Sequence, residues 1–141
     1  MTDVVVWLPY ASPEEAAQRL GGLPDGVRVD CYRADGDEYP DSLDEAQFYV
    51  IPYMRGEETL SRADEMTNLK VVQTLTAGYE NFLPSIPDAV TLCNAAGVHD
   101  ASTAELALAL TLASGRHLDT FARQQPAGRW EPVFGSALAD K

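Results

Sequence analysis

Basic residues and long apolar runs are both scarce in this sequence. Ten lysines and arginines stand against 22 aspartates and glutamates, which gives a formal net charge of −12. Nucleic acids and anionic membranes are recognised by basic surfaces, so we expect neither as a partner. The longest apolar run, LALALTLA, is far shorter than the ~20 residues that cross a bilayer. We therefore expect no membrane span.

Cysteine and histidine are also rare, with two residues of each. Cys31 and Cys93 lie far apart, in no metal-binding or redox spacing, and each adjoins an apolar run. We expect buried free thiols and a reducing, cytoplasmic compartment. No cluster with ligand spacing surrounds His99 or His117, so no metal site is expected. The basic region of a secretory signal is missing ahead of VVVWLP, and no such signal is expected.

What the sequence does contain is a series of short apolar runs in a chain of 141 residues, about one domain long. These runs predict five strands, at 4–9, 27–33, 48–53, 70–78 and 89–95. Strands that alternate with helical stretches predict an α/β fold with helices on both faces of a parallel sheet. We expect a flavodoxin-like five-stranded sheet in the order 2-1-3-4-5.

The segments between the predicted strands have their own signals. Ser12 as N-cap, Pro13 and Glu15 predict a helix over 12–20. The stretch 56–69 has the pattern of an amphipathic helix, and NFLPSIPD that of a short helix or turn. The acidic segment ADGDEYPDSLDEA predicts a solvated loop, partly helical near its end.

A further helix is predicted over 100–119, DASTAELALALTLASGRHLD. Its leucines alternate with small residues, which taken alone favours a strand. Alanine and leucine are strong helix formers, however, and Ser102 with Glu105 has the spacing of a capping box. The helix is apolar nearly all round, so it needs cover on every side. One small sheet covers only one side, and we therefore expect a second domain or a second chain.

Several nucleotide and phosphate sites are excluded by missing residues. The sequence has no G-x-G-x-x-G and no P-loop. A receiver domain needs acids at the ends of its first and third strands, where this chain reads WLPY and IPYM. An FMN site needs a phosphate loop rich in Ser, Thr and Gly, where this chain reads PYASPEE.

Three loops at the carboxyl ends of predicted strands remain as candidate sites, because ligands of open α/β sheets bind there. In PYMRG, Tyr53 is a candidate pocket wall and Arg55 a candidate anion partner, unless this is a plain surface turn. TLTAGY, with Gly78, predicts a nest of backbone N–H groups for a carboxylate, although a plain strand-to-helix turn looks alike. In NAAGVHDAS, His99 donates to a substrate or faces a cofactor, unless it is a structural or solvent-facing histidine. It forms no catalytic dyad with Asp100.

The order of these pieces resembles the D-isomer-specific 2-hydroxyacid dehydrogenases, a family that includes phosphoglycerate, glycerate and formate dehydrogenases. The resemblance rests on NLKVVQTLTAGYENF, VTLCNAAGVHDASTAELALALTLASGRHL, AGRWEP and LADK. It is specific from about residue 67 to the end, and over 1–66 only the fold pattern agrees. Family members continue into a strand and G-x-G-x-x-G, so the final GSALADK resembles the approach to a Rossmann domain that these residues do not contain.

The resemblance implies roles for individual residues. The family loop whose backbone amides hold the substrate carboxylate matches Thr76, Ala77 and Gly78. Tyr53 loosely matches a substrate-pocket residue, and His99 falls where relatives often place an asparagine or a similar polar residue beside the substrate. Thr103 would lie near the nicotinamide of the cofactor. The catalytic arginine, glutamate and histidine of the family have no counterpart in this chain.

The resemblance also implies a division of the chain. Residues 1–98 would be the substrate-binding domain, and 99–141 an interdomain or dimerisation helix and arm that leads to an NAD-binding domain. Helix 101–119 and the following arm, with Trp130, would form a homodimer.

The function expected from the resemblance is that of the substrate-binding portion of an NAD(P)-dependent oxidoreductase. The parent enzyme would use NAD or NADP and interconvert a small D-2-hydroxy acid and a 2-oxo acid. This chain alone would be inactive and would not bind the cofactor tightly. The alternative is a stand-alone, non-catalytic binding or dimerisation module derived from such an enzyme. A damaged or proteolysed copy of the whole enzyme is a third possibility.

Overall fold

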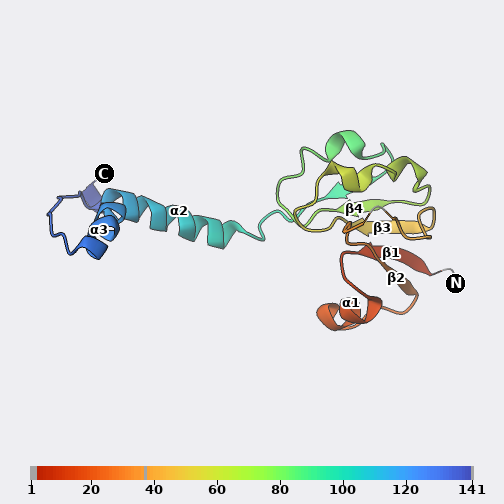
Figure 1. Ribbon diagram of the computed structural model, residues 1–141. Coiled ribbons are helices and arrows are strands. Elements are labelled where there is room, and N and C mark those ends of the chain that lie inside the picture. The colour runs from red at the N-terminus through yellow and green to blue at the C-terminus, as the bar shows by residue number, and fades with distance from the viewer. Residues whose placement is uncertain (1–2, 37, 141) are drawn as a thin grey trace. The chain divides into compact units, whose positions relative to one another are not determined.

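Valine-rich strands form one parallel sheet in this computed structural model, which describes residues 3–36 and 38–140 (Figure 1). The strands are β1 (Val4–Leu8), β2 (Val27–Cys31), β3 (Ala46–Val50), β4 (Val71–Gln73) and β5 (Thr91–Cys93). Their order is β2-β1-β3-β4-β5, and every neighbouring pair is parallel. The predicted α/β class and strand order 2-1-3-4-5 are confirmed, although each strand is shorter than its apolar run.

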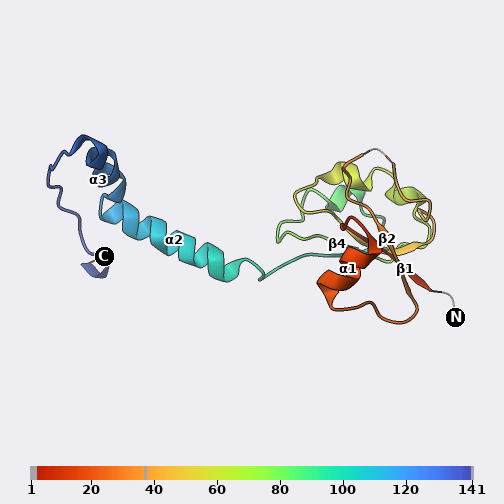
Figure 2. The ribbon, with the colours of Figure 1, turned by 60° about the horizontal axis from the view of Figure 1, so that its bottom comes forward.

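The chain divides into two units, Met1–Gly97 and Val98–Lys141. The first unit contains the sheet, helix α1 (Pro13–Leu20) and three short 3₁₀ helices, η1 (Glu57–Leu60), η2 (Ala63–Glu65) and η3 (Leu83–Ser85). In Figure 1, α1 and these short helices lie at opposite ends of the first unit, and Figure 2 shows the same unit turned to bring α1 forward.

Helix α1 begins and ends as its sequence predicts. The Ser12 hydroxyl accepts a hydrogen bond from the Glu15 N–H at 3.3 Å, and the Glu15 carboxylate accepts one from the Ala11 N–H. This is the reciprocal capping box. Gly21 ends the helix in the left-handed conformation, with φ 76°, which glycine adopts without steric cost.

The two faces of the sheet are packed by alternate residues of each strand. Val5 and Trp7 of β1 point into one core, together with Tyr49 and Val72. Leu8 points to the other face, into a smaller core beneath α1. Trp7 is fully buried and meets the Tyr49 ring edge-on at 5.6 Å. Such aromatic pairs add about 0.5–1.5 kcal/mol to the free energy gained from burial.

The α-helix predicted over 56–69 is wrong. The segment folds as η1 and η2, joined by turns. Its buried apolar residues recur every third position: Leu60, Ala63, Met66 and Leu69. A spacing of three keeps them on one face of a 3₁₀ conformation, whereas in an α-helix the same spacing drifts around the axis.

Two smaller expectations for the first unit also need correction. The acidic loop has no helix near its end, only a turn in which the N–H groups of Glu45 and Ala46 both donate to the Ser42 carbonyl. Asp37 of that loop lies outside the described residues. Cys31 and Cys93 are free, as expected, but both are half-buried, because Cys93 lies on an edge strand and Cys31 at the end of the other.

The second unit contains α2 (Asp100–Gly115), α3 (Leu118–Gln124), η4 (Gln125–Ala127) and η5 (Leu138–Asp140). The single long apolar helix predicted over 100–119 is not supported, because His117 takes a left-handed conformation with φ 53° and separates α2 from α3. None of the described helices is long and apolar enough to cross a bilayer. Lys141, the last residue of GSALADK, lies outside the described residues.

The capping box predicted at Ser102 and Glu105 is also wrong. Helix α2 begins earlier, at Asp100, and its N-cap residue His99 makes no side-chain cap bond. Ser102 lies within the first turn, where its hydroxyl donates to the His99 carbonyl at 3.0 Å. The N–H groups of this helix start are therefore left without the side-chain acceptor that the sequence pattern predicted.

The arm after η4 returns to the end of α2 through a close contact between glycines. A Cβ placed on Gly135 would lie 2.3 Å from the Gly115 carbonyl oxygen. Only glycine fits at such a distance, so Gly135 allows the arm to pack directly on the backbone of the helix end.

Candidate functional site

Four loops meet at the carboxyl edge of the sheet and form a cleft of about 300 Å³. They follow β1, β2, β3 and β4 along the chain. The cleft is lined by Pro9, Tyr10, Arg33, Asp35, Pro52, Tyr53, Arg55 and Leu75. Tyr53, predicted from sequence as a pocket wall, is 57% exposed within it. This is the edge at which open α/β sheets bind ligands.

The loop after β4 has its carbonyl groups paired and its N–H groups unpaired. The Thr76 carbonyl accepts from the Thr74 hydroxyl at 2.9 Å and from the Ala95 N–H at 3.0 Å. The Gly78 carbonyl accepts from the Thr76 hydroxyl at 2.8 Å. In the described part of the chain, no acceptor takes the N–H of Thr76, Ala77 or Gly78. The loop can therefore offer donors to a bound anion.

Asn94, just after β5, fixes this loop from the neighbouring strand. Its side-chain amide donates to the Ala77 carbonyl at 2.7 Å. The site residues predicted from sequence do not include Asn94, although this residue begins the NAAGVHDAS loop that follows a predicted strand. The feature of the sequence that indicates this residue is an amide side chain directly after a strand, at the edge of the sheet where ligands bind.

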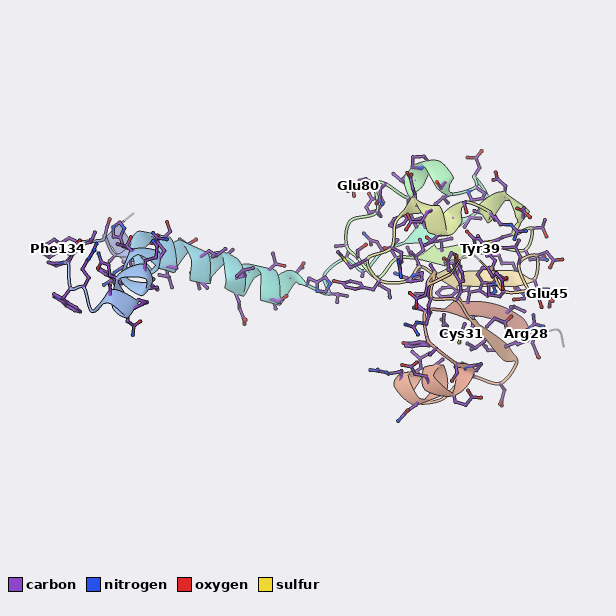
Figure 3. The ribbon with its side chains drawn as sticks, viewed as in Figure 1. Arg28, Cys31, Tyr39, Glu45, Glu80 and Phe134 are labelled. Carbon is purple, nitrogen blue, oxygen red and sulfur yellow. The ribbon has the colours of Figure 1, made fainter. Side chains whose placement is uncertain are left out.

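Glu80 lies at the far end of the same loop, on the surface (Figure 3). Its carboxylate accepts from the Tyr79 N–H at 2.9 Å. Hydrogen bonds from its own N–H and from that of Tyr79 lower the pKa of the Glu80 carboxyl group. Backbone donors at this end of the loop thus already bind the carboxylate of Glu80.

Two arginines and one aspartate form a charged wall of the cleft. The Asp35 carboxylate binds Arg33 through Oδ2 at 2.9 Å and Arg55 through Oδ1 at 2.5 Å. The exposed fraction of the side chain is 56% for Arg33, 47% for Asp35 and 42% for Arg55. The sequence predicts Arg55 as an anion partner but not Arg33 or Asp35, because Arg33 ends a predicted strand and Asp35 belongs to the predicted acidic loop.

Two residues in these charged loops take a conformation that side chains with a Cβ rarely adopt. Ala34 has φ 53° and Met54 has φ 61°. Ala34 separates Arg33 from Asp35, and Met54 precedes Arg55, whose N–H donates to the Pro52 carbonyl at 3.1 Å. The left-handed conformation costs about 1–2 kcal/mol for such a residue. Strain of this kind is concentrated at functional sites.

A second polar cavity, of about 570 Å³, lies beside β2. The Trp7 indole N–H donates to the buried Ser42 hydroxyl at 2.9 Å, which in turn donates to Asp30. Arg28 pairs with Glu45 at 2.9 Å (Figure 3). These groups satisfy one another, so the network supports the fold around Trp7.

Cys31, on the same strand, is kept as a thiol. Burial, together with nearby Asp30, Glu14 and Glu15, raises the pKa of its thiol. A thiol with a raised pKa is a poor nucleophile at neutral pH.

The other two predicted site residues, His99 and Thr103, belong to the second unit. Both are exposed, and the Thr103 N–H donates to the His99 carbonyl at 2.9 Å. The second unit also contains a cavity of about 780 Å³, formed by α3, η4 and the arm with Trp130. Trp130 and Phe134 are 92% and 96% exposed, and Phe134 is labelled in Figure 3.

Three solved structures share this fold over almost the whole chain. A D-isomer specific 2-hydroxyacid dehydrogenase from Xanthobacter autotrophicus Py2, in complex with NADPH and MES, matches 99% of the chain at 21% identity and TM-score 0.69. A D-isomer specific 2-hydroxyacid dehydrogenase family protein from Aeromonas salmonicida matches 98% at 19% identity and TM-score 0.72. An NADPH-dependent glyoxylate/hydroxypyruvate reductase from Sinorhizobium meliloti, in complex with NADP and sulfate, matches 99% at 22% identity and TM-score 0.70.

The chain spans less than half of each of these proteins: 44%, 44% and 43% of their lengths. No protein-family model and no curated protein sequence matches it. The resemblance stated from sequence is therefore confirmed as a likeness of fold to D-2-hydroxyacid dehydrogenases, over part of their length.

Proposed function

We propose that this chain is the substrate-binding portion of an NAD(P)-dependent oxidoreductase that interconverts a D-2-hydroxy acid and a 2-oxo acid. The observation that carries the proposal is the loop after β4, where the N–H groups of Thr76, Ala77 and Gly78 remain free at the carboxyl edge of the sheet. Three unpaired donors on successive residues suit the carboxylate that every 2-hydroxy and 2-oxo acid carries.

The other predicted substrate contacts extend this assignment. Tyr53 lines the cleft beside Leu75, which directly precedes the loop. His99 would meet the substrate from the start of α2, and Thr103, on the first turn of that helix, would lie near the nicotinamide. Two of the similar structures are complexes with NADPH or NADP, which supports a nicotinamide cofactor for the parent protein.

The residues of this chain do not by themselves fit a dinucleotide. The sequence has no G-x-G-x-x-G, the feature that lets backbone approach the pyrophosphate. We therefore assign cofactor binding, and the catalytic acid and base, to residues outside these 141, and we expect the chain alone to be inactive.

The second unit supplies the proposed contact between protomers. Leu106 and Leu110 lie on one side of α2, and Leu108 and Leu112 on the opposite side, because successive residues are 100° apart. All four are exposed. One side of the helix would be covered by another domain of the parent and the other by a second copy, with the arm around Trp130 contributing to a homodimer.

The alternative function, a stand-alone module that binds or dimerises without catalysis, is favoured by these same leucines. It differs from the leading proposal in one measurable respect. The module would act through α2 alone, and the loop after β4 would have no ligand.

The test is hydride transfer by the complete product of the gene. NADH or NADPH oxidation is followed with glyoxylate, pyruvate and hydroxypyruvate, with the 141-residue chain assayed in parallel. We expect turnover by the complete product and none by the 141-residue chain. Absence of turnover with every 2-oxo acid would count against the oxidoreductase, and turnover by the short chain would show that its own residues are sufficient.

A substitution at Gly78 tests the role of the loop in binding without disturbing the rest of the fold. A Cβ on Gly78 would have the Glu80 carboxylate as its nearest atom, at 3.6 Å, so G78A should fold normally. It would nevertheless obstruct an anion that approaches the backbone, and we expect KM for the 2-oxo acid to rise at least tenfold. Gly36, where a Cβ would meet nothing within 4 Å, provides the control variant G36A.

A further inference from the structure

We propose that Arg33 and Arg55 form a subsite for a second anionic group, so that the substrate is a dianionic 2-oxo or 2-hydroxy acid. The inference rests on the proposed function and specifies its substrate class. The second group is a carboxylate or a phosphate at the end of the substrate remote from the reacting carbon.

The charge of the cleft is the first argument. The chain as a whole has a net charge of −12, yet the side chains that line this cleft include two arginines and one aspartate. One carboxylate, that of Asp35, is shared between both guanidinium groups. Each guanidinium has five N–H donors, and Asp35 engages only part of them. A second anion would complete the charge balance of the wall.

The other acidic side chain near Arg55 is committed elsewhere. Glu58 accepts the Gly56 N–H at 2.9 Å, and this backbone bond is the largest cause of the lowered pKa of its carboxyl group, with a smaller effect of Arg55. Glu58 does not line the cleft. Arg55 therefore keeps donors for a ligand.

The backbone of the two loops is the second argument. Two of the three non-glycine residues with positive φ in the described chain, Ala34 and Met54, adjoin these arginines. An ordinary surface ion pair does not require a strained backbone. Strain that recurs in two neighbouring loops, beside the two cations of one cleft, is what a site with fixed geometry requires.

The position of the cleft is the third argument. Leu75 lines it, and the next residues along the chain, Thr76 to Gly78, form the loop with free N–H groups. The loop would bind the carboxylate beside the reacting carbon, and the arginines the remote anion. Arginine suits this task because its planar fork binds carboxylate and phosphate with paired hydrogen bonds.

The experiment compares matched ligands on the complete product of the gene by titration calorimetry. For a carboxylate, 2-oxoglutarate is compared with 2-oxopentanoate, which has the same five-carbon chain and lacks the second carboxylate. For a phosphate, phosphohydroxypyruvate is compared with hydroxypyruvate. We expect the dianion of one pair to bind at least tenfold more tightly than its monoanionic partner, and that pair identifies the second group.

The variants assign the preference to the arginines. R33Q and R55Q should each weaken binding of the dianion about tenfold and leave the monoanion unchanged. R62Q is the matched control, because Arg62 is 45% exposed and pairs with Glu65 at 2.5 Å, as Arg55 is 42% exposed and pairs at 2.5 Å. D35N, which removes the competing carboxylate, should strengthen dianion binding, whereas a purely structural ion pair predicts that D35N and R55Q act alike.

The results that overturn the inference differ from those that overturn the proposed function. Equal binding of dianion and monoanion in both pairs, or equal losses for both ligands in R55Q, would remove the subsite and leave the oxidoreductase. Failure of every 2-oxo acid to bind would overturn both.

Discussion

The two units of the chain treat their apolar residues in opposite ways. In the first, Trp7, Tyr49, Ile51 and Val72 are at most 2% exposed, within a core that spans the sheet. In the second, none of the described residues from 98 to 139 is buried, and Trp130 is 92% exposed. Apolar residues that stabilise a fold do so by leaving water. The first unit therefore buries its apolar side chains within its own fold, whereas the second unit leaves its apolar side chains exposed.

This difference in burial indicates which of the two units carries each proposed activity. A ligand site needs rigid support, which the sheet gives to the loop after β4 and to the arginine cleft. An interface needs exposed apolar surface, which α2 and the arm provide. The predictions that follow test this division, from the largest expected effect to the smallest.

The two tryptophans of the chain give the largest contrast. W7A removes a fully buried side chain and its hydrogen bond to Ser42, and should lower the free energy of unfolding by about 3–5 kcal/mol. W130A removes a side chain that is 92% exposed, and should change it by less than about 0.5 kcal/mol. Urea unfolding followed by circular dichroism measures both. Similar losses in the two variants would show that the second unit has a core of its own.

The leucines of α2 test the proposed interface. A glutamate pair on one side, L106E/L110E, or on the other, L108E/L112E, places charge where apolar contact is proposed. We expect one of the two pairs to weaken self-association at least a hundredfold by analytical ultracentrifugation, because a buried, unpaired charge is strongly unfavourable. The urea midpoint of the first unit should not move. A monomeric wild-type protein would contradict the homodimer.

How far the sequence predicts the fold depends on whether a pattern is local. Ser12, Pro13 and Glu15 determine the start of α1 among near neighbours, and the prediction is confirmed. The strand order is confirmed too, because short apolar runs separated by crossovers permit few arrangements. The α-helix predicted over 56–69 is wrong because over so short a segment a spacing of three drifts only a little around an α-helix, and contact with the core decides for the 3₁₀ conformation.

The site was only partly predictable for a related reason. The glycine and threonines of TLTAGY indicate a loop, but its free N–H groups depend on Asn94 and Ala95, which reach the loop from the next strand. Arg33 and Asp35 belong to the cleft only because β2 ends at Cys31, before them. Sequence spacing does not report which loops meet at a sheet edge.

The buried Tyr49 hydroxyl extends the comparison of the two units to the effect of pH on stability, because all six tyrosines lie in the first unit. Burial raises the pKa of Tyr49 well above its ordinary value, against the smaller effect of its bond to the Thr59 carbonyl. Below about pH 10, where the tyrosine of the unfolded chain is also protonated, this group leaves stability unchanged with pH. Above it, the unfolded chain alone ionises, and stability should fall by about 1.4 kcal/mol per pH unit.

The measurement is urea unfolding between pH 9 and about 11.5 for the wild type and Y49F. The variant loses one hydrogen bond at neutral pH but should show a shallower alkaline slope. Equal slopes would mean that Tyr49 ionises without unfolding the first unit. The second unit, which contains no tyrosine, should keep its helical circular dichroism signal through the same range.

Substitution of two serines near helix starts should have the smallest effects, on the free energy of unfolding and on helical content. Ser12 caps α1 by accepting the Glu15 N–H, so S12A should lower the free energy of unfolding by about 1 kcal/mol. Ser102 occupies the first turn of α2 and donates to a carbonyl that already accepts the Thr103 N–H. S102A removes no cap and gains helix propensity, so helical content by circular dichroism should stay constant or rise slightly. A loss in S102A equal to that in S12A would mean that α2 depends on the Ser102 hydroxyl, as the sequence first suggested. The expected difference would instead show that α2 starts without a side-chain cap, whereas α1 depends on one.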